Sequence, residues 1–318
     1  MVIVMIKIYK NDEVNTEIKE IENIEINSWI NVINPTNTEI KELSEKLCID
    51  ENYLIKMLDE EEQSRIDIND DIQTIIIDIP TEVKKKDYSV NITNPLIIMQ
   101  IRNEYIVTIC TKKNNILDDF INGVVPEFFT EKKSRFTFQL MYKIALTYIK
   151  DLKQINEEIN KAEDLMQKST QNKDLLNLMH LRKTLVYYKT SLKGNQIVLD
   201  RITQKNIITL YDEDKTLLEN TIIEYQQAIE MSEIYNGLLN STIDAFGTII
   251  SNNLNIVMKI LAAFTIIISI PTMVASFMGM NIPLGFFAKS DFSFLIVILM
   301  SVILSLLVAY ILKKKNML

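Results

Sequence analysis

The C-terminal part of the chain contains a stripe of small and polar side chains within an otherwise apolar stretch. Its members recur at alternating steps of four and three residues, a spacing that puts them on one face of a helix: Met258, Ala262, Thr265, Ser269, Thr272 and Ser276, with Asn255 one turn below. Hydroxyl and amide groups on one face could line a water-filled pore. The same small residues could instead allow close packing against another helix. Periodicity alone leaves both interpretations open.

Two apolar segments must position this stripe. Residues 260–288 and 292–312 contain no charged side chain. A bilayer core is spanned by about 20 apolar residues in a helix, so both segments predict transmembrane helices, joined by a short loop around residues 279–291. A buried hairpin in a soluble core is the alternative, but such a hairpin keeps a polar stripe of Lys and Glu, which these segments lack. Because two spans cannot enclose a pore, a pore would require an oligomer.

Lysines beside the two spans predict their orientation. Lys259 precedes the first span and residues 313–315 are all lysine, whereas the connecting loop contains only Lys289. Lys and Arg collect on the cytoplasmic side, so both termini are expected in the cytoplasm of a multi-pass protein of the cell membrane. The N-terminal MVIVMIKIY is too short for a signal peptide and is typical of a β-strand.

The first 130 residues alternate between strand and helix patterns and predict a cytosolic α/β domain over 1–130. Strands are expected at 2–9, 29–33, 73–79, 96–102 and 105–110. Helices are expected at 38–47 and 51–60, with Asn37 and Asp50 as N-caps. We expect Trp29 in the core of this domain.

No proline occurs between Glu127 and Ile270, which favours long helices. We predict three, at about 134–168, 175–200 and 205–278, with polar turns at 169–174 and 194–206. The third, at about 70 residues and on the order of 100 Å, would run from the soluble part into the membrane. The predicted domains are therefore a helical layer and stalk at 131–257 and a transmembrane hairpin with a basic tail at 258–318.

Composition excludes several functions. The 318 residues include 34 basic and 42 acidic ones, for a net charge of −8, which argues against a nucleic-acid partner. One histidine, His180, and two distant cysteines, Cys48 and Cys110, provide no metal cluster and no disulfide framework. Neither G-x-x-x-x-G-K-[ST] nor G-x-G-x-x-G occurs, so we expect no nucleotide and no ATP-driven pump. The chain is not expected to be an enzyme.

A short motif directly follows the polar stripe, Phe277-Met278-Gly279-Met280-Asn281. Gly-Met-Asn at the end of the first of two C-terminal transmembrane helices resembles the signature of the CorA family of magnesium channels. Pro271-Thr272 lies on the same helix, and the tail at 313–318 is similar to that family's basic tail. The motif match covers about 255–281 and 310–318, whereas the rest of the chain agrees in architecture alone.

The resemblance implies a homopentamer in which five copies of the first span surround a pore for Mg²⁺, with Co²⁺ as a second candidate ion. The outer mouth would be ringed by Gly279, Met280 and Asn281. Amide and carbonyl oxygens there could bond to a hydrated Mg²⁺, which releases its water reluctantly. Met258 and Leu261 would form an apolar gate, with Asn255 at its cytosolic end. A dication crossing 100 mV gains about 4.6 kcal/mol, so passive influx would need no ATP.

The resemblance also implies gating by cytosolic Mg²⁺ that bridges carboxylates of neighbouring subunits. The stalk position that matches the family's aspartate is Asn220, so the candidate ligands are Glu219 and Glu224, facing an acid such as Asp67, Asp70 or Asp71. The family's Met-Pro-Glu-Leu loop is replaced here by residues 282–285, Ile-Pro-Leu-Gly, which removes an acidic ring. The rival hypothesis is a membrane-anchored coiled-coil scaffold or sensor without conduction, with the stripe as a packing seam.

Overall fold

The computed structural model describes residues 6–59, 62–69, 71–84, 89–166, 172–205, 207–280 and 292–315. Contacts within the chain divide it into two compact units, Met1–Thr242 and Ile243–Leu318. The first unit therefore combines the α/β part with most of the helical layer. The second unit contains both apolar helices.

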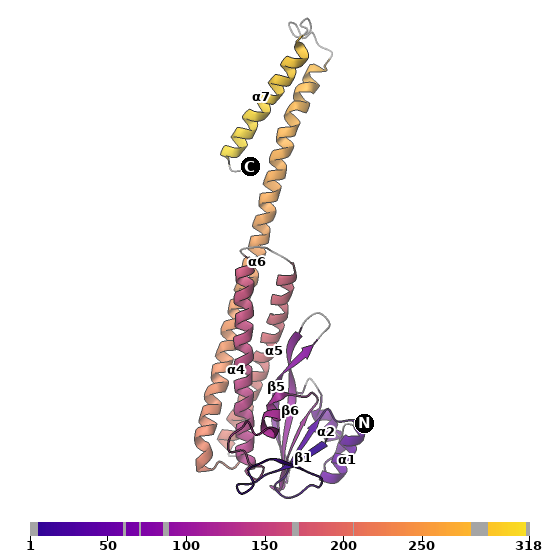
Figure 1. Ribbon diagram of the computed structural model, residues 1–318, viewed down its shortest axis with the longest axis vertical. Helices are drawn as coiled ribbons and strands as arrows, with labels where there is room; N and C mark the ends of the chain where they lie inside the picture. Colours follow the sequence, from indigo (N-terminus) through magenta and orange to yellow (C-terminus); the bar gives the residue numbers. More distant parts are fainter. Residues whose placement is uncertain are drawn as a thin grey trace. The chain divides into compact units, whose positions relative to one another are not determined.

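A seven-stranded sheet forms the centre of the first unit, in the order β2-β1-β3-β7-β6-β5-β4 (Figure 1). Its strands are β1 (Ile6–Lys10), β2 (Lys19–Ile21), β3 (Trp29–Ile33), β4 (Arg65–Asn69), β5 (Ile72–Lys84), β6 (Ser89–Ile101) and β7 (Tyr105–Cys110). Among the described strands, β3 and β7 are the one parallel pair. The predicted bounds of β3 and β7 are confirmed. The short strands β2 and β4 were not predicted, and β5 and β6 are longer than expected.

One face of the sheet is covered by α1 (Asn37–Leu47) and α2 (Glu51–Met57), over a core that includes Ile30, Val32, Ile97 and Met99. The predicted N-cap Asn37 is wrong. Thr36 caps α1 because its hydroxyl accepts from the Glu39 backbone N–H at 3.3 Å, while the Glu39 carboxylate accepts from the Thr36 backbone N–H at 2.8 Å. The predicted cap Asp50 is confirmed, and α2 ends at Met57, earlier than expected.

The other face of the sheet is covered by α3 (Asn115–Ile121), α4 (Lys133–Met166) and α5 (Asn172–Lys205). Trp29 is fully buried here against Phe120, Phe128 and Phe136, which confirms the prediction that it belongs to the core. The turn predicted at 194–206 is wrong as far as residue 205, because 194–205 continue α5. Gly194 lets α5 approach Ser64 closely, since a Cβ at this position would lie 3.0 Å from Ser64 Oγ.

The longest helix is α6 (Lys215–Met278), which runs through Pro271 and is preceded by a short 3₁₀ helix (Asp212–Asp214). It begins ten residues later than the predicted 205. Its first part packs against α4 and α5, where Thr242 donates to Glu163 at 2.6 Å and Lys193 pairs with Glu233 at 2.8 Å. The last helix is α7 (Ser293–Lys314). Segments 212–278 and 294–314 each contain a stretch that is long and apolar enough to cross a membrane.

Candidate functional site: an exposed polar face on the first apolar helix

Helix α7 runs beside the last part of α6 (Figure 1), and a few residues on each of the two helices are buried. On α6, Ala263 and Val274 are buried, and Ile267, Ile270 and Met278 are partly buried between and beyond them. On α7, the buried residues are Ser301 and Leu312. The two buried positions are eleven residues apart on each helix. Equal spacing is expected when two antiparallel helices meet at both positions. The contact face of α6 is thereby defined.

The predicted polar stripe lies on a different face of α6. Every member from Asn255 to Ser276 is exposed, and Met258 and Leu261 keep 54 % and 58 % of their surface. Counting 3.6 residues per turn, the stripe lies roughly opposite the face that contacts α7. The small residues therefore do not serve packing within this chain. Water, lipid or a second copy of the chain is left to face them.

The hydroxyl groups on this face donate their protons to the helix backbone. Thr265 and Ser269 donate to the backbone carbonyls of Leu261 and Ile266, each at 2.8 Å. Thr272 donates to the Ile268 carbonyl at 3.4 Å. A hydroxyl has one proton to donate and two lone pairs, so these side chains present only acceptors outward. The water shell of a cation points its protons outward and is the natural partner of such a surface.

The polar face continues below the part that sequence reasoning identified. Asp244, Thr248 and Ser251 occupy the same face at the same three- and four-residue steps, and all three are exposed. Together with Gly247 and Asn255 they line one shallow groove. The sequence shows the same three- and four-residue periodicity here. The surrounding residues are also polar, however, so the pattern does not differ from that of an ordinary solvated helix.

The end of α6 carries the first part of the signature. The Gly279 backbone N–H donates to the Ala275 carbonyl at 3.0 Å, and the Met280 N–H donates to the Phe277 carbonyl at 3.4 Å. Both residues are exposed. Asn281 and the loop that follows lie outside the described residues.

The predicted regulatory carboxylates are not brought together within one chain. Glu219 is exposed and Glu224 half-buried on α6. Asp67 on β4 already accepts from Arg65 at 2.8 Å and Tyr53 at 3.3 Å, Asp71 lies 3.6 Å from Arg102, and Asp70 is outside the described residues. In the described part of the chain, no group of three or more His, Cys, Asp or Glu residues could hold a metal ion.

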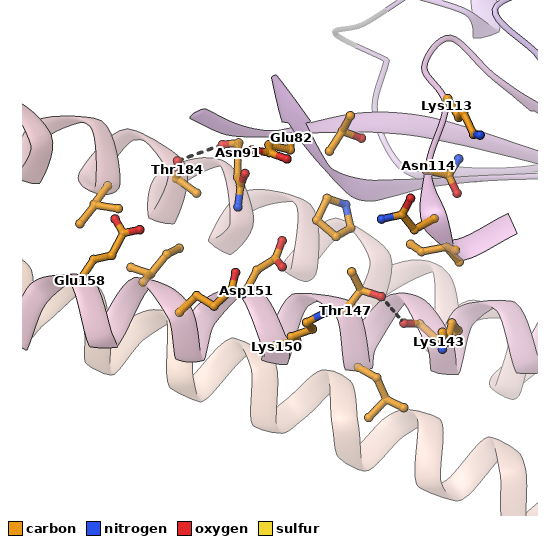
Figure 2. A pocket seen from close by; sticks show the side chains of 18 of the residues that line it. Glu82, Asn91, Lys113, Asn114, Lys143, Thr147, Lys150, Asp151, Glu158 and Thr184 are labelled. Carbon is orange, nitrogen blue, oxygen red and sulfur yellow. Dashed lines mark hydrogen bonds between the residues drawn. The ribbon is translucent and has the colours of Figure 1, made fainter. Parts of the chain in front are cut away.

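A cavity of about 730 Å³ lies between the β5–β6 hairpin and helices α3, α4 and α5 (Figure 2). Glu82 and Asp151 are on opposite walls, Lys150 lies beside Asp151, and His180 also lines the space. Tyr188 donates to Asp151 at 2.6 Å, while burial, with a further contribution from Glu82, raises the pKa of this carboxyl. Charges of both signs share this cavity, so it does not favour one kind of ion.

Comparison with known proteins places this arrangement in a family. The family described as "CorA-like Mg²⁺ transporter protein" matches residues 25–314. The chain is 27 % identical over 297 residues to the "Cobalt/magnesium transport protein CorA" of Methanocaldococcus jannaschii, covering 91 % of this chain and 90 % of that protein.

Solved structures agree with this match. The complete structure of the CorA magnesium transporter from M. jannaschii aligns over 100 % of both chains with a TM-score of 0.81 at 23 % identity. The structure of the soluble domain of that protein aligns with 77 % of this chain and 97 % of its own, with a TM-score of 0.66 at 26 % identity. The fold is thus a membrane transporter fold with a soluble α/β domain, a long helix and two C-terminal apolar helices. The chain belongs to the CorA family, whose members are transporters and not enzymes.

Proposed function

We propose that the chain forms a passive channel for Mg²⁺ in the cell membrane, as a homopentamer with five copies of α6 around one pore. The observation that carries the proposal is the exposed polar face of α6, which α7 leaves uncovered. A helix surrounded by lipid gains nothing from hydroxyls on one side, whereas a helix that lines water does. In the rival scaffold hypothesis, the outward lone pairs of these hydroxyls could be bonded only by another helix that has free hydrogen-bond donors.

The chemistry of the face suits a hydrated dication. Thr265, Ser269 and Thr272 use their protons on the helix backbone and offer lone pairs outward. Mg²⁺ keeps several waters, and those waters can donate to such rings without being removed. At the outer mouth, Gly279, Met280 and Asn281 supply carbonyl and amide oxygens. Co²⁺ is a second candidate because the M. jannaschii relative is named for both ions.

The gate and its control extend the proposal. Met258 and Leu261 present apolar side chains to the pore and close it by excluding water. Cytosolic Mg²⁺ bound by Glu219 or Glu224 and an acid of the next subunit favours the closed pentamer. Within the described part of one chain, no three such ligands lie together, which is compatible with a site shared between subunits. Both termini face the cytoplasm, and the membrane potential drives influx without nucleotide.

The test is Asn281→Ala in the full-length protein. It should abolish Mg²⁺ flux and leave the oligomer assembled, because it removes amide groups from the mouth and not packing contacts. Asn253→Ala is the matched control, since Asn253 is exposed on α6 on the side away from the polar face. Flux at the wild-type rate in Asn281→Ala would refute the role of the mouth and favour the scaffold.

A further inference from the structure

A second cavity, of about 650 Å³, lies at the carboxyl ends of β3 and β7. These strands form the one parallel pair among the described strands. In open α/β sheets, ligands bind in crevices outside the carboxyl ends of parallel strands. The cavity has apolar walls from Tyr9, Ile33 and Ile121, and its size is in the range of small-molecule sites.

A buried amide at this cavity lacks a partner. Asn31 is only 2 % exposed, yet it lines the cavity. The Trp29 indole N–H donates to Thr108 Oγ1 at 2.8 Å, and Thr108 donates to Asn31 Oδ1 at 3.1 Å. Thr108 is thus bonded to the carbonyl side of the Asn31 amide. Its NH₂ is left without an acceptor among the described residues. This NH₂ group is not one of the fully buried polar atoms without a partner, so it reaches the cavity, where a ligand oxygen or a water can accept from it.

Three lysines surround the same cavity in a chain whose net charge is −8. Lys7 pairs with Glu20 at 2.9 Å, Lys113 with Asp118 at 3.3 Å, and Lys112 lies 3.4 Å from the Asn94 amide oxygen. Among the described residues that line the cavity, Asp118 is the one carboxylate. Lysine ammonium groups outnumber carboxylates among the described lining residues, and together with the amide donor they favour a ligand that brings anionic oxygens.

We propose that this crevice binds a small organic anion, a phosphate or carboxylate with an apolar body. One anionic oxygen accepts from Asn31 Nδ2, the lysines neutralise the charge, and the apolar body rests on Tyr9, Ile33 and Ile121. This site is independent of the pore.

Phenyl phosphate is a suitable probe, because it combines one phosphate with one ring. Its binding to the full-length protein in detergent would be measured by titration calorimetry and by thermal melting, in Mg²⁺-free buffer. Inorganic phosphate and phenol test the two halves of the ligand separately. We expect phenyl phosphate to bind at least ten times more tightly than either half. Absence of binding, or equal affinity for inorganic phosphate, would overturn the proposal.

Asn31→Asp is the sharpest variant, because it keeps the acceptor for Thr108 and replaces the NH₂ donor by a second oxygen. It should lower the affinity for phenyl phosphate at least tenfold, and Asn160→Asp, the same change on the exposed surface of α4, should not. Lys7→Gln provides a milder test outside the core and should weaken binding severalfold, with Lys153→Gln as its control. Unchanged affinity in both Asn31→Asp and Lys7→Gln would place the anion elsewhere and contradict the assignment.

Discussion

Removal of the Asn195 side chain should weaken the attachment of α5 to the edge of the sheet. Asn195 is fully buried, and its amide bonds to β5 just beyond the first residue of β4, Arg65, which pairs with Ile76. Asn195 Nδ2 donates to the Asp78 carbonyl at 2.7 Å, while Oδ1 accepts from the Asp78 backbone N–H at 2.8 Å and from Ser64 at 2.9 Å. One side chain therefore satisfies both backbone groups of a strand residue that has no neighbour on that side.

The magnitude follows from what each partner loses in Asn195→Ala. The Asp78 carbonyl keeps one donor, the Tyr148 hydroxyl at 3.1 Å, but the Asp78 N–H has no other acceptor among the described residues. An orphaned buried N–H costs about 1–3 kcal/mol and each of the other two hydrogen bonds contributes about 0.5–1.5 kcal/mol. The sum is about 2–6 kcal/mol of unfolding free energy, before any loss of packing.

Urea denaturation of residues 1–242, followed by circular dichroism, would measure this loss, with Asn160→Ala on the surface of α4 as the matched control. The control should change the unfolding free energy by less than about 0.5 kcal/mol. Asn195→Asp should be destabilised at neutral pH and partly recover in acid, where a protonated carboxyl can again donate to Asp78. If Asn195→Ala lowers the unfolding free energy by less than about 1 kcal/mol, the hydrogen bonds of Asn195 to Asp78 and Ser64 are not needed, and the reasoning is refuted.

Three further predictions concern charge and gating. Burial raises the pKa of Asp151, so the folded state favours the protonated carboxyl. The stability that this protonation contributes is lost as pH rises from about 4 through the raised pKa. Asp151→Asn should therefore be more stable than wild type in urea at pH 7 and equally stable at pH 4. Met258→Ser or Leu261→Ser should ease wetting of the gate and raise basal Mg²⁺ conductance severalfold in liposomes. If both leave it unchanged or lower it, the gate lies elsewhere. Millimolar Mg²⁺ should protect the full-length protein from protease, and Glu219→Gln with Glu224→Gln should remove that protection; protection that persists would exclude these two ligands.

Much of the fold was accessible from local pattern. Strands β3 and β7 were predicted to the residue because each is a run of β-branched and apolar residues ended by a turn. Strands β2 and β4 were missed because they lie at the edges of the sheet, are short and expose polar side chains, so neither shows the alternation of a buried strand. Gly194 led to the wrong prediction of a turn. This glycine lets α5 approach Ser64, a tertiary contact that no local sequence pattern contains.

The candidate site divides in the same way. Helical spacing was sufficient to find the stripe from Asn255 to Ser276, but it could not separate a pore lining from a packing seam. That distinction depends on which face contacts α7, which becomes visible only from the burial of Ala263 and Val274. The amide of Asn31 was beyond sequence reasoning for another reason: its missing acceptor is defined by Trp29 and Thr108, which come from different strands.

The most direct test of the proposed function is Mg²⁺ uptake into proteoliposomes that contain the purified protein and an imposed membrane potential. A passive channel should take up Mg²⁺ without nucleotide, faster as the interior is made more negative, because each 100 mV contributes about 4.6 kcal/mol to the transfer of a dication. Uptake should stop when the potential is dissipated and the concentrations are equal. No uptake above that of empty liposomes, or uptake that ignores the potential, would contradict the account.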